Sequence, residues 1–253
     1  MLTLLFACVE DTPAPPTLDE FMHLAWQHYA SEDFTAMAEA TVAVSSTFDP
    51  EEFPLQGTFT DITDDEAALV DVGWDADPSK ATGFYVVDVL ACSDGELEKA
   101  LTNLHQEEVY PDNYTAYERS YTTDDEAYFS GETPVLYWDT TYSVTIPLFG
   151  GYTTSIHGGV QRIEGEWDTP AYATRTWAPN PADCQEEEMH FEQDYQIEVF
   201  YPSNEGVVHV YGMWRQFGVT ADSDQDDPLI TNTILDAMHD YFDNTSSYCA
   251  SLR

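Results

Sequence analysis

The order of strand and helix patterns after residue 82 restricts the fold of this chain more than any other feature. An apolar strand pattern at residues 83–91 leads into a helix pattern that begins with the capping box of Ser93 and Glu96. Strand patterns then follow one another with short connections, at residues 114–121, 135–146, 151–163, 171–177, 191–201 and 207–217. Consecutive strands of this kind favour one antiparallel sheet.

The last helix pattern provides a second layer. Asp227 and Pro228 are typical of a helix start, with aspartate as the cap and proline in the first turn. The apolar residues that follow recur at helical spacing and form one stripe, made of Ile230, Ile234, Met238, Tyr241 and Phe242. We expect this stripe to pack on the sheet. The strand at 191–201 alternates apolar and polar side chains, which predicts one solvated face there.

The residues before this region predict a smaller, mainly helical extension. Thr17 and Glu20 form a capping box at the start of one helix, and a second helix is expected over about residues 33–44. Residues 56–62 and 67–74 are expected to form a hairpin, and residues 75–79 a linker. The expected organisation is a leader and spacer at 1–16, a helical and hairpin extension at 17–80, and a main domain at 81–253.

The element order from residue 83 to 249 resembles the helix-grip fold of the START and polyketide-cyclase (SRPBCC) superfamily. The resemblance implies an α+β fold in which a curved antiparallel sheet wraps a long C-terminal helix and leaves a cavity between them. Short stretches at residues 114–121, 194–198 and 210–215 also resemble uncharacterised bacterial lipoproteins. Neither group has a catalytic motif that transfers to residues of this chain.

The N-terminus resembles a lipoprotein signal. Leu5, Phe6 and Ala7 precede Cys8, and an acidic, proline-rich stretch follows it. We expect Cys8 to carry a lipid and to anchor the protein in the bacterial cell envelope, which would be its only contact with a membrane. The tail of an ordinary secretion signal and a buried thiol are the alternatives.

The charge of the chain excludes some partners. Lys and Arg number 7 against 48 Asp and Glu, which gives a formal net charge of −41. Nucleic acid is therefore not an expected partner, because its affinity for proteins comes largely from cationic side chains. The acidic residues are spread along the chain, as in a surface adapted to salt; a calcium-dependent surface is the alternative, with residues 222–226 as a weak candidate loop.

The cysteines after Cys8 predict one disulfide. Cys92 ends a strand pattern and Cys249 ends the last helix, so both neighbourhoods are ordered, whereas Cys184 lies in a polar loop. Exported chains usually pair the cysteines they can. We expect Cys92 to pair with Cys249, and the sequence does not tell whether Cys184 is free. The cysteine and histidine spacings show no zinc motif, and no metal or cofactor is expected.

Arginine is scarce and lies on the predicted strands. Arg162 and Arg215 share the side of their strands with apolar residues, and Arg119 and Arg175 also fall on or beside strands. A buried guanidinium needs either a carboxylate or an anionic ligand. Glu118, Asp139, Asp194 and Glu198 are available for internal pairing. The candidate ligand-binding residues are Arg119, Arg162, Arg215, Tyr195 and Tyr211.

No segment contains a catalytic motif such as HExxH or GxSxG. We therefore expect a non-catalytic ligand-binding or protein-interaction domain, whose protein partner the sequence does not name. One alternative is a carrier of a lipid or small anionic molecule, with an apolar pocket of roughly 300 Å³ or more between sheet and helix. A second is a hydrolase, in which His157 or His209 would contact a serine and a carboxylate in a cleft.

Overall fold

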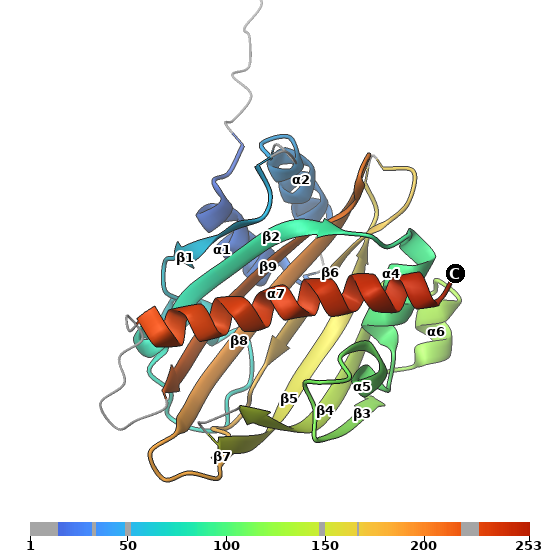
Figure 1. Ribbon diagram of the computed structural model, residues 1–253. Helices are drawn as coiled ribbons and strands as arrows, with labels where there is room; N and C mark the ends of the chain where they lie inside the picture. The colour runs from blue at the N-terminus through green and yellow to red at the C-terminus, as the bar shows by residue number, and fades with distance from the viewer. Residues whose placement is uncertain (1–14, 32–33, 49–51, 147–149, 166, 219–227) are drawn as a thin grey trace, which may run out of the picture.

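The protein is built on one antiparallel sheet of nine strands, with helices on both of its faces (Figure 1). The computed structural model describes residues 15–31, 34–48, 52–146, 150–165, 167–218 and 228–253. The strand order is β1-β2-β9-β8-β6-β5-β4-β3, and β7 pairs with β5 at the side of this path. The expected α+β, helix-grip arrangement is confirmed.

The strands lie close to the positions that the sequence predicts. Their bounds are Leu55–Phe59 (β1), Thr82–Leu90 (β2), Ala116–Tyr121 (β3), Val135–Ile146 (β4), Gly150–Ile163 (β5), Ala171–Trp177 (β6), Asp183–Cys184 (β7), His190–Ser203 (β8) and Gly206–Gly218 (β9). β8 and β9 form a long hairpin, and a register shift between Phe191 and Gln193 interrupts its pairing.

The long C-terminal helix α7, Pro228–Ser251, crosses one face of the sheet, here called the α7 face (Figure 1). Its apolar stripe is buried as expected, including Ile230, Ile234, Met238 and Phe242. The helices α4 (Asp94–Thr102), α5 (Gln106–Val109) and α6 (Asp125–Phe129) lie beside it at one end of the sheet. Cys92 and Cys249 form the expected disulfide, which fixes the end of α7 to the segment after β2.

The opposite face, here called the α1 face, is covered by the N-terminal helices. The helix α1, Leu18–His28, begins at the predicted capping box, in which Thr17 and Glu20 bond to each other's backbone. It packs with α2, Phe34–Ser45, over β8 and β9, and Trp26 and Trp214 are fully buried between them. The expected solvated face of β8 is therefore wrong, because helices cover both sides of this strand. Asp194, Gln196 and Glu198 of this strand point under α7, where Asp194 is 1% exposed.

The expected hairpin of residues 56–62 and 67–74 is also wrong in its pairing. β1 pairs with β2 and so belongs to the main sheet, with Leu55 opposite Val87. The following residues form the short helix α3, Asp64–Ala67, because Thr63 and Glu66 make a capping box. A short 3-10 helix, Pro78–Lys80, precedes β2. None of the described helices is both long and apolar enough to cross a membrane.

Candidate functional site

A cavity of about 240 Å³ lies between α7 and the sheet, here called the outer chamber. Aromatic rings and methionines make much of its wall, and polar side chains such as Asp112, Asn113, Thr233 and Asp240 also line it. The aromatic and methionine members come from β4, β5, β9 and α7: Tyr142, Tyr152, Tyr211, Met213, Phe217, Met238 and Tyr241. The alternation of β9 explains part of this wall, since Tyr211, Met213 and Phe217 share one side of the strand.

Three tyrosines separate the outer chamber from a smaller inner chamber of about 80 Å³. Tyr142, Tyr211 and Tyr241 line both chambers and are here called the tyrosine partition. The Tyr241 hydroxyl lies 3.2 Å from that of Tyr114, and the Tyr211 hydroxyl donates to Gln196 Oε1 at 2.9 Å. Burial raises the pKa of Tyr211 and of Tyr241, so both hydroxyls remain neutral.

The inner chamber is more polar than the outer one. Its wall includes Arg119, Glu198, Gln106, Gln196, Thr174 and Thr176, together with the Leu101 and Trp138 side chains. Glu198 accepts hydrogen bonds from the Thr174 hydroxyl at 2.7 Å and contacts His209 Nε2 at 2.8 Å. A ligand group that reaches this chamber would therefore meet hydrogen-bonding partners rather than hydrocarbon.

Arg215 lines the outer chamber, and its charge is already neutralised. Its Nε and one terminal nitrogen donate to the two oxygens of Asp194 at 2.9 and 3.0 Å, and the guanidinium lies over the Phe191 ring. Burial acts to lower the pKa of the Arg215 guanidinium, but Asp194 outweighs this and raises the pKa above its ordinary value. The expected internal ion pair is thus present for Arg215.

Arg119 and Arg162 have different surroundings. Arg119 lines the inner chamber, lies over the Trp138 ring at 4.4 Å, and donates to Thr140 at 3.1 Å and to the Leu101 carbonyl at 3.2 Å. Within the described residues it makes no ion pair. Arg162 lines neither chamber: it pairs with Glu98 of α4 at 2.6 Å, a partner outside the expected set.

Tyr195 does not belong to the cavity. It lies on the α1 face, where its ring packs edge-on against Trp26 with 5.9 Å between centroids. The prediction that Tyr195 and Tyr211 share a site is therefore wrong: Tyr195 is opposite Trp214 in the β8–β9 pairing, whereas Tyr211 is opposite Glu198. Paired residues of neighbouring strands point to the same face of a sheet, and successive residues along one strand point to opposite faces. The sequence analysis missed Tyr142, Tyr152 and Tyr241 as wall residues, although Tyr241 lies in the recognised stripe of α7.

The remaining sequence candidates give no site. Cys184 is free and partly buried. Cys8 and the candidate calcium loop at 222–226 lie outside the described residues. Within the described residues, no cluster of histidine, cysteine and acidic side chains has the geometry of a metal site.

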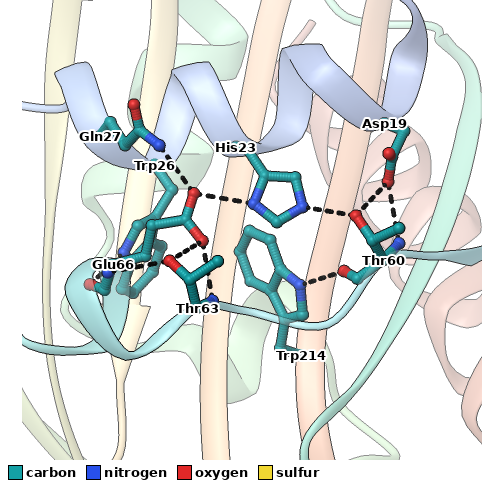
Figure 2. A network of polar contacts seen from close by, with 8 residues as sticks. All are labelled: Asp19, His23, Trp26, Gln27, Thr60, Thr63, Glu66 and Trp214. Atoms are coloured by element: carbon teal, nitrogen blue, oxygen red, sulfur yellow. Dashed lines mark hydrogen bonds and ion pairs between the residues drawn. The ribbon is translucent and has the colours of Figure 1, made fainter. Parts of the chain in front are cut away.

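A second polar network lies on the α1 face, where α1 meets the segment from β1 to α3 (Figure 2). His23 Nδ1 is 2.8 Å from Glu66 Oε1, and His23 Nε2 is 2.9 Å from the Thr60 hydroxyl. Glu66 is 3% exposed and also accepts from Gln27 Nε2 and from Thr63, at 2.8 to 2.9 Å. A hydroxyl, an imidazole and a carboxylate in this order are the connections of a hydrolase triad.

The contacts of Asp19 argue against a nucleophilic role for Thr60. Asp19 Oδ1 is 2.8 Å from the Thr60 hydroxyl and also accepts the Thr60 backbone N–H at 2.8 Å (Figure 2). A carboxylate at this distance opposes negative charge on the hydroxyl oxygen, and it occupies the nearest N–H donor that an oxyanion would use. The network therefore holds α1 against the sheet edge. His157 and His209 contact Asp139 and Glu198, and no contact of either with a serine is found among the described residues.

Several solved structures share this arrangement of elements. A fragment of a STAR-related lipid transfer protein from Xanthomonas axonopodis is 14% identical, with a TM-score of 0.48, over 77% of this chain and 98% of that chain. A protein from Thermus thermophilus is 9% identical with a TM-score of 0.47, over 67% and 98% of the two chains. The human StAR-related lipid transfer protein 5 is 8% identical with a TM-score of 0.44, over 87% and 97%.

Structures of the START type, which the element order resembles, are among the solved structures to which this chain is similar. No protein-family model matches the sequence, and no curated protein matches it. Identities of 14% and less describe a shared fold alone, so the chemistry of the site is derived from this chain.

Proposed function

We propose that this protein binds a small, uncharged, mainly apolar molecule between the sheet and α7 and holds it without changing it chemically. The observation that supports this best is the outer chamber of about 240 Å³, lined in part by aromatic rings and separated by the tyrosine partition from a polar inner chamber. An unfilled interior of this kind favours ligand binding over a role limited to protein contact, because interiors are otherwise close-packed.

The electrostatics of the two chambers favour a neutral ligand over an anion. In the outer chamber, Asp194 binds Nε and one terminal nitrogen of Arg215 and neutralises the charge that would attract a carboxylate or phosphate. In the inner chamber, Arg119 shares the wall with Glu198. An anion would therefore meet a carboxylate in each place, whereas a hydroxyl or carbonyl would find donors and acceptors.

The volume limits the ligand to one or two rings. A cavity of roughly 150 Å³ is enough for benzene, and pockets for drug-sized molecules begin at roughly 300 Å³. The outer chamber, at about 240 Å³, lies between these values and is smaller than the size expected for a carrier. A long-chain lipid would fit only if Tyr211 and Tyr241 moved and joined the chambers.

Binding of 2-naphthol, followed by calorimetry and by its fluorescence, tests the proposal. Ala237 lies at the exposed edge of the outer chamber, so A237W should block the chamber and weaken binding at least tenfold. The matched control is A250W, an exposed position on the same helix that lines neither chamber. Equal binding by both variants, or no binding by the unaltered protein, would show that the chamber is not the site.

The same titration with 2-naphthoate separates the neutral ligand from the anionic alternative. We expect the naphthol to bind at least tenfold more tightly, because the carboxylate would lose its hydration beside Asp194 or Glu198. Tighter binding of the naphthoate would instead assign Arg119 or Arg215 to an anionic ligand.

We further propose that the protein is exported and tethered to the bacterial cell envelope by a lipid on Cys8. The support is the order of an apolar run, a cysteine and an acidic spacer in the sequence. Intact-mass measurement of protein extracted from its own membranes should show a diacylglycerol adduct that is absent from C8S. An unmodified cysteine in the extracted protein would contradict the tether.

A further inference from the structure

Arg175 on β6 lies on the α1 face, and among the residues that the structure describes it has no acidic partner. Its guanidinium lies over the rings of Tyr29 at 4.7 Å and Trp26 at 5.2 Å. One terminal nitrogen donates to the Trp26 carbonyl at 3.1 Å. No ion pair to Arg175 is found within the described residues, and its Nε is buried without a partner. The C-terminal end of α1 offsets only part of the charge.

Two further buried donors without partners lie next to Arg175. The Tyr29 hydroxyl and the Gln161 side-chain nitrogen both lack a hydrogen bond, although these residues are 3% and 0% exposed. The orientation of the Gln161 amide is fixed, because its oxygen accepts from the Ala30 backbone N–H at 2.7 Å. Its NH₂ group is therefore the end left unpaired.

The strand register brings the three donors around Gly159. Gly159 is directly opposite Arg175 in the β5–β6 pairing, and Gln161 is two positions further on the same side of β5. A Cβ on Gly159 would lie 2.7 Å from the Tyr29 hydroxyl, so this hydroxyl sits over the glycine. The cluster thus contains one positive charge and three N–H or O–H donors, with no carboxylate among them.

A partly buried positive charge beside unpaired N–H and O–H donors is complementary to an anion. Burial lowers the pKa of the Arg175 guanidinium, which is the direction expected for a charge without a counter-ion. Leaving both the charge and the donors unpaired is unfavourable, because buried polar groups lose their hydration without gaining a partner. A small inorganic anion would satisfy all three donors at once.

We propose that Arg175, Tyr29 and Gln161 form a binding site for a single halide-sized inorganic anion, between α1 and the sheet. The site is on the face opposite the chambers and is independent of the proposed ligand. The bound anion stabilises the contact of α1 with β5 and β6. Chloride is the probe of choice.

Thermal unfolding in sodium chloride and in sodium gluconate at equal ionic strength tests the site. At a chloride concentration tenfold above Kd, we expect Tm to be about 3 to 6 °C higher in chloride. R175Q and Y29F should abolish this difference. Y29F removes only one oxygen, so it keeps the test valid if R175Q does not fold. The matched control K80Q removes a positive charge at a 61% exposed side chain and should retain the difference.

Three results would overturn the proposal. The first is an equal Tm of the unaltered protein in both salts, which would assign the donors to water. The second is a full chloride effect in both R175Q and Y29F, which would place the anion elsewhere. The third is a larger chloride effect in E32Q/D33N than in the unaltered protein, which would mean that carboxylates of the chain following α1 in sequence compete with chloride for the charge. Crystals soaked in bromide should show an anomalous peak beside Arg175 and Tyr29.

Discussion

At the residue scale, the interior of this protein depends on how each buried polar group is paired. Asp194 is 1% exposed, and its two oxygens accept hydrogen bonds from Arg215 and Gln196. Glu66 on the other face accepts from His23, Gln27 and Thr63. The chain has many exposed acids, and these two differ from them because the fold provides donors in place of water.

Replacing Asp194 with asparagine should destabilise the protein strongly. D194N leaves the buried Arg215 charge without its counter-ion, which typically costs about 3 to 5 kcal/mol. The free energy of unfolding in urea measures this loss. The control is D77N, which breaks an exposed pair with Lys80 at 3.7 Å and should cost about 1 kcal/mol or less. Similar losses in the two variants would mean that the buried pair contributes no more than a surface pair.

Glu66 should make stability depend on pH on the acid side. Burial acts to raise the pKa of the Glu66 carboxyl, but hydrogen bonds from Thr63, Gln27 and His23 outweigh it and hold the pKa below its usual range. A lowered pKa in the folded state stabilises above the unfolded pKa, and this stability is lost as pH falls through the folded pKa. Urea unfolding between about pH 3 and 6 should therefore show a smaller slope for E66Q than for the unaltered protein. Parallel pH profiles of the two proteins would rule this role out, and the exposed E205Q should leave the slope unchanged.

The Thr60 contacts make a related prediction about His23. The Thr60 hydroxyl has one proton, yet it lies within hydrogen-bond distance of both His23 Nε2 and Asp19 Oδ1. All contacts of the network are hydrogen bonds only when both nitrogens of His23 carry protons. Nitrogen-15 spectra of the imidazole measure which of its two ring nitrogens carry protons. T60V should remove the His23–Asp19 connection and leave the His23–Glu66 contact in place.

At the scale of elements, α7 is the piece on which the cavity depends. The helix forms one wall of both chambers, and the disulfide between Cys92 and Cys249 ties its last turns to the end of β2. The two cysteines are 157 residues apart, so the bridge removes much freedom from the unfolded chain.

Removing this bridge should therefore destabilise the protein. C92S/C249S is expected to lose about 2 to 5 kcal/mol of unfolding free energy, as is usual for a native disulfide. Hydrogen exchange should increase first in the last turns of α7. C184S, which changes the free cysteine, should leave both measurements nearly unchanged. Unaltered exchange in the last turns of α7 of the double variant would mean that packing alone holds the helix.

The elements were predictable where a local pattern decides them. Alternation placed β4, β6 and β9, and helical spacing placed α7, because side-chain period follows directly from backbone geometry. The partner of β1 was not predictable, because β1 pairs with β2, which lies more than 20 residues further along the sequence. The helix at residues 64–67 did have a signal, the capping box of Thr63 and Glu66, which the hairpin prediction overlooked.

The site was predictable in part, for the same reason. Strand parity correctly placed Arg215 and Tyr211 on one side of β9, facing α7. The alternation of side chains along a strand does not say which face packs on α7 when helices cover both faces. For this reason Tyr195 was assigned to the α7 face, although it lies on the α1 face. The carboxylate of Glu98 that pairs with Arg162 comes from α4, whose placement follows only from the complete fold.

At the scale of the whole molecule, the net charge of −41 should make stability sensitive to salt of any kind. Self-repulsion favours expansion, and added salt screens it over about 8 Å at physiological ionic strength and less above it. Raising sodium gluconate from about 0.05 to 1 M should increase Tm by an amount on the order of 5 °C. The increase should shrink near the isoelectric point of about 4.1, where the net charge is zero and self-repulsion is smallest. An equal increase at both pH values would attribute it to the solute and not to screening.

The helices on the α1 face have a mechanical consequence for binding. Because α1 and α2 pack on the α1 face of β8 and β9, these strands cannot move away from α7 to make room for a larger ligand. Any enlargement must come from the opposite boundary, through displacement of α7 along the stretch between its start at Pro228 and its covalent tether at Cys249. Ligand entry should accordingly require the N-terminal part of α7 to move away from the sheet while the disulfide holds its C-terminal end in place.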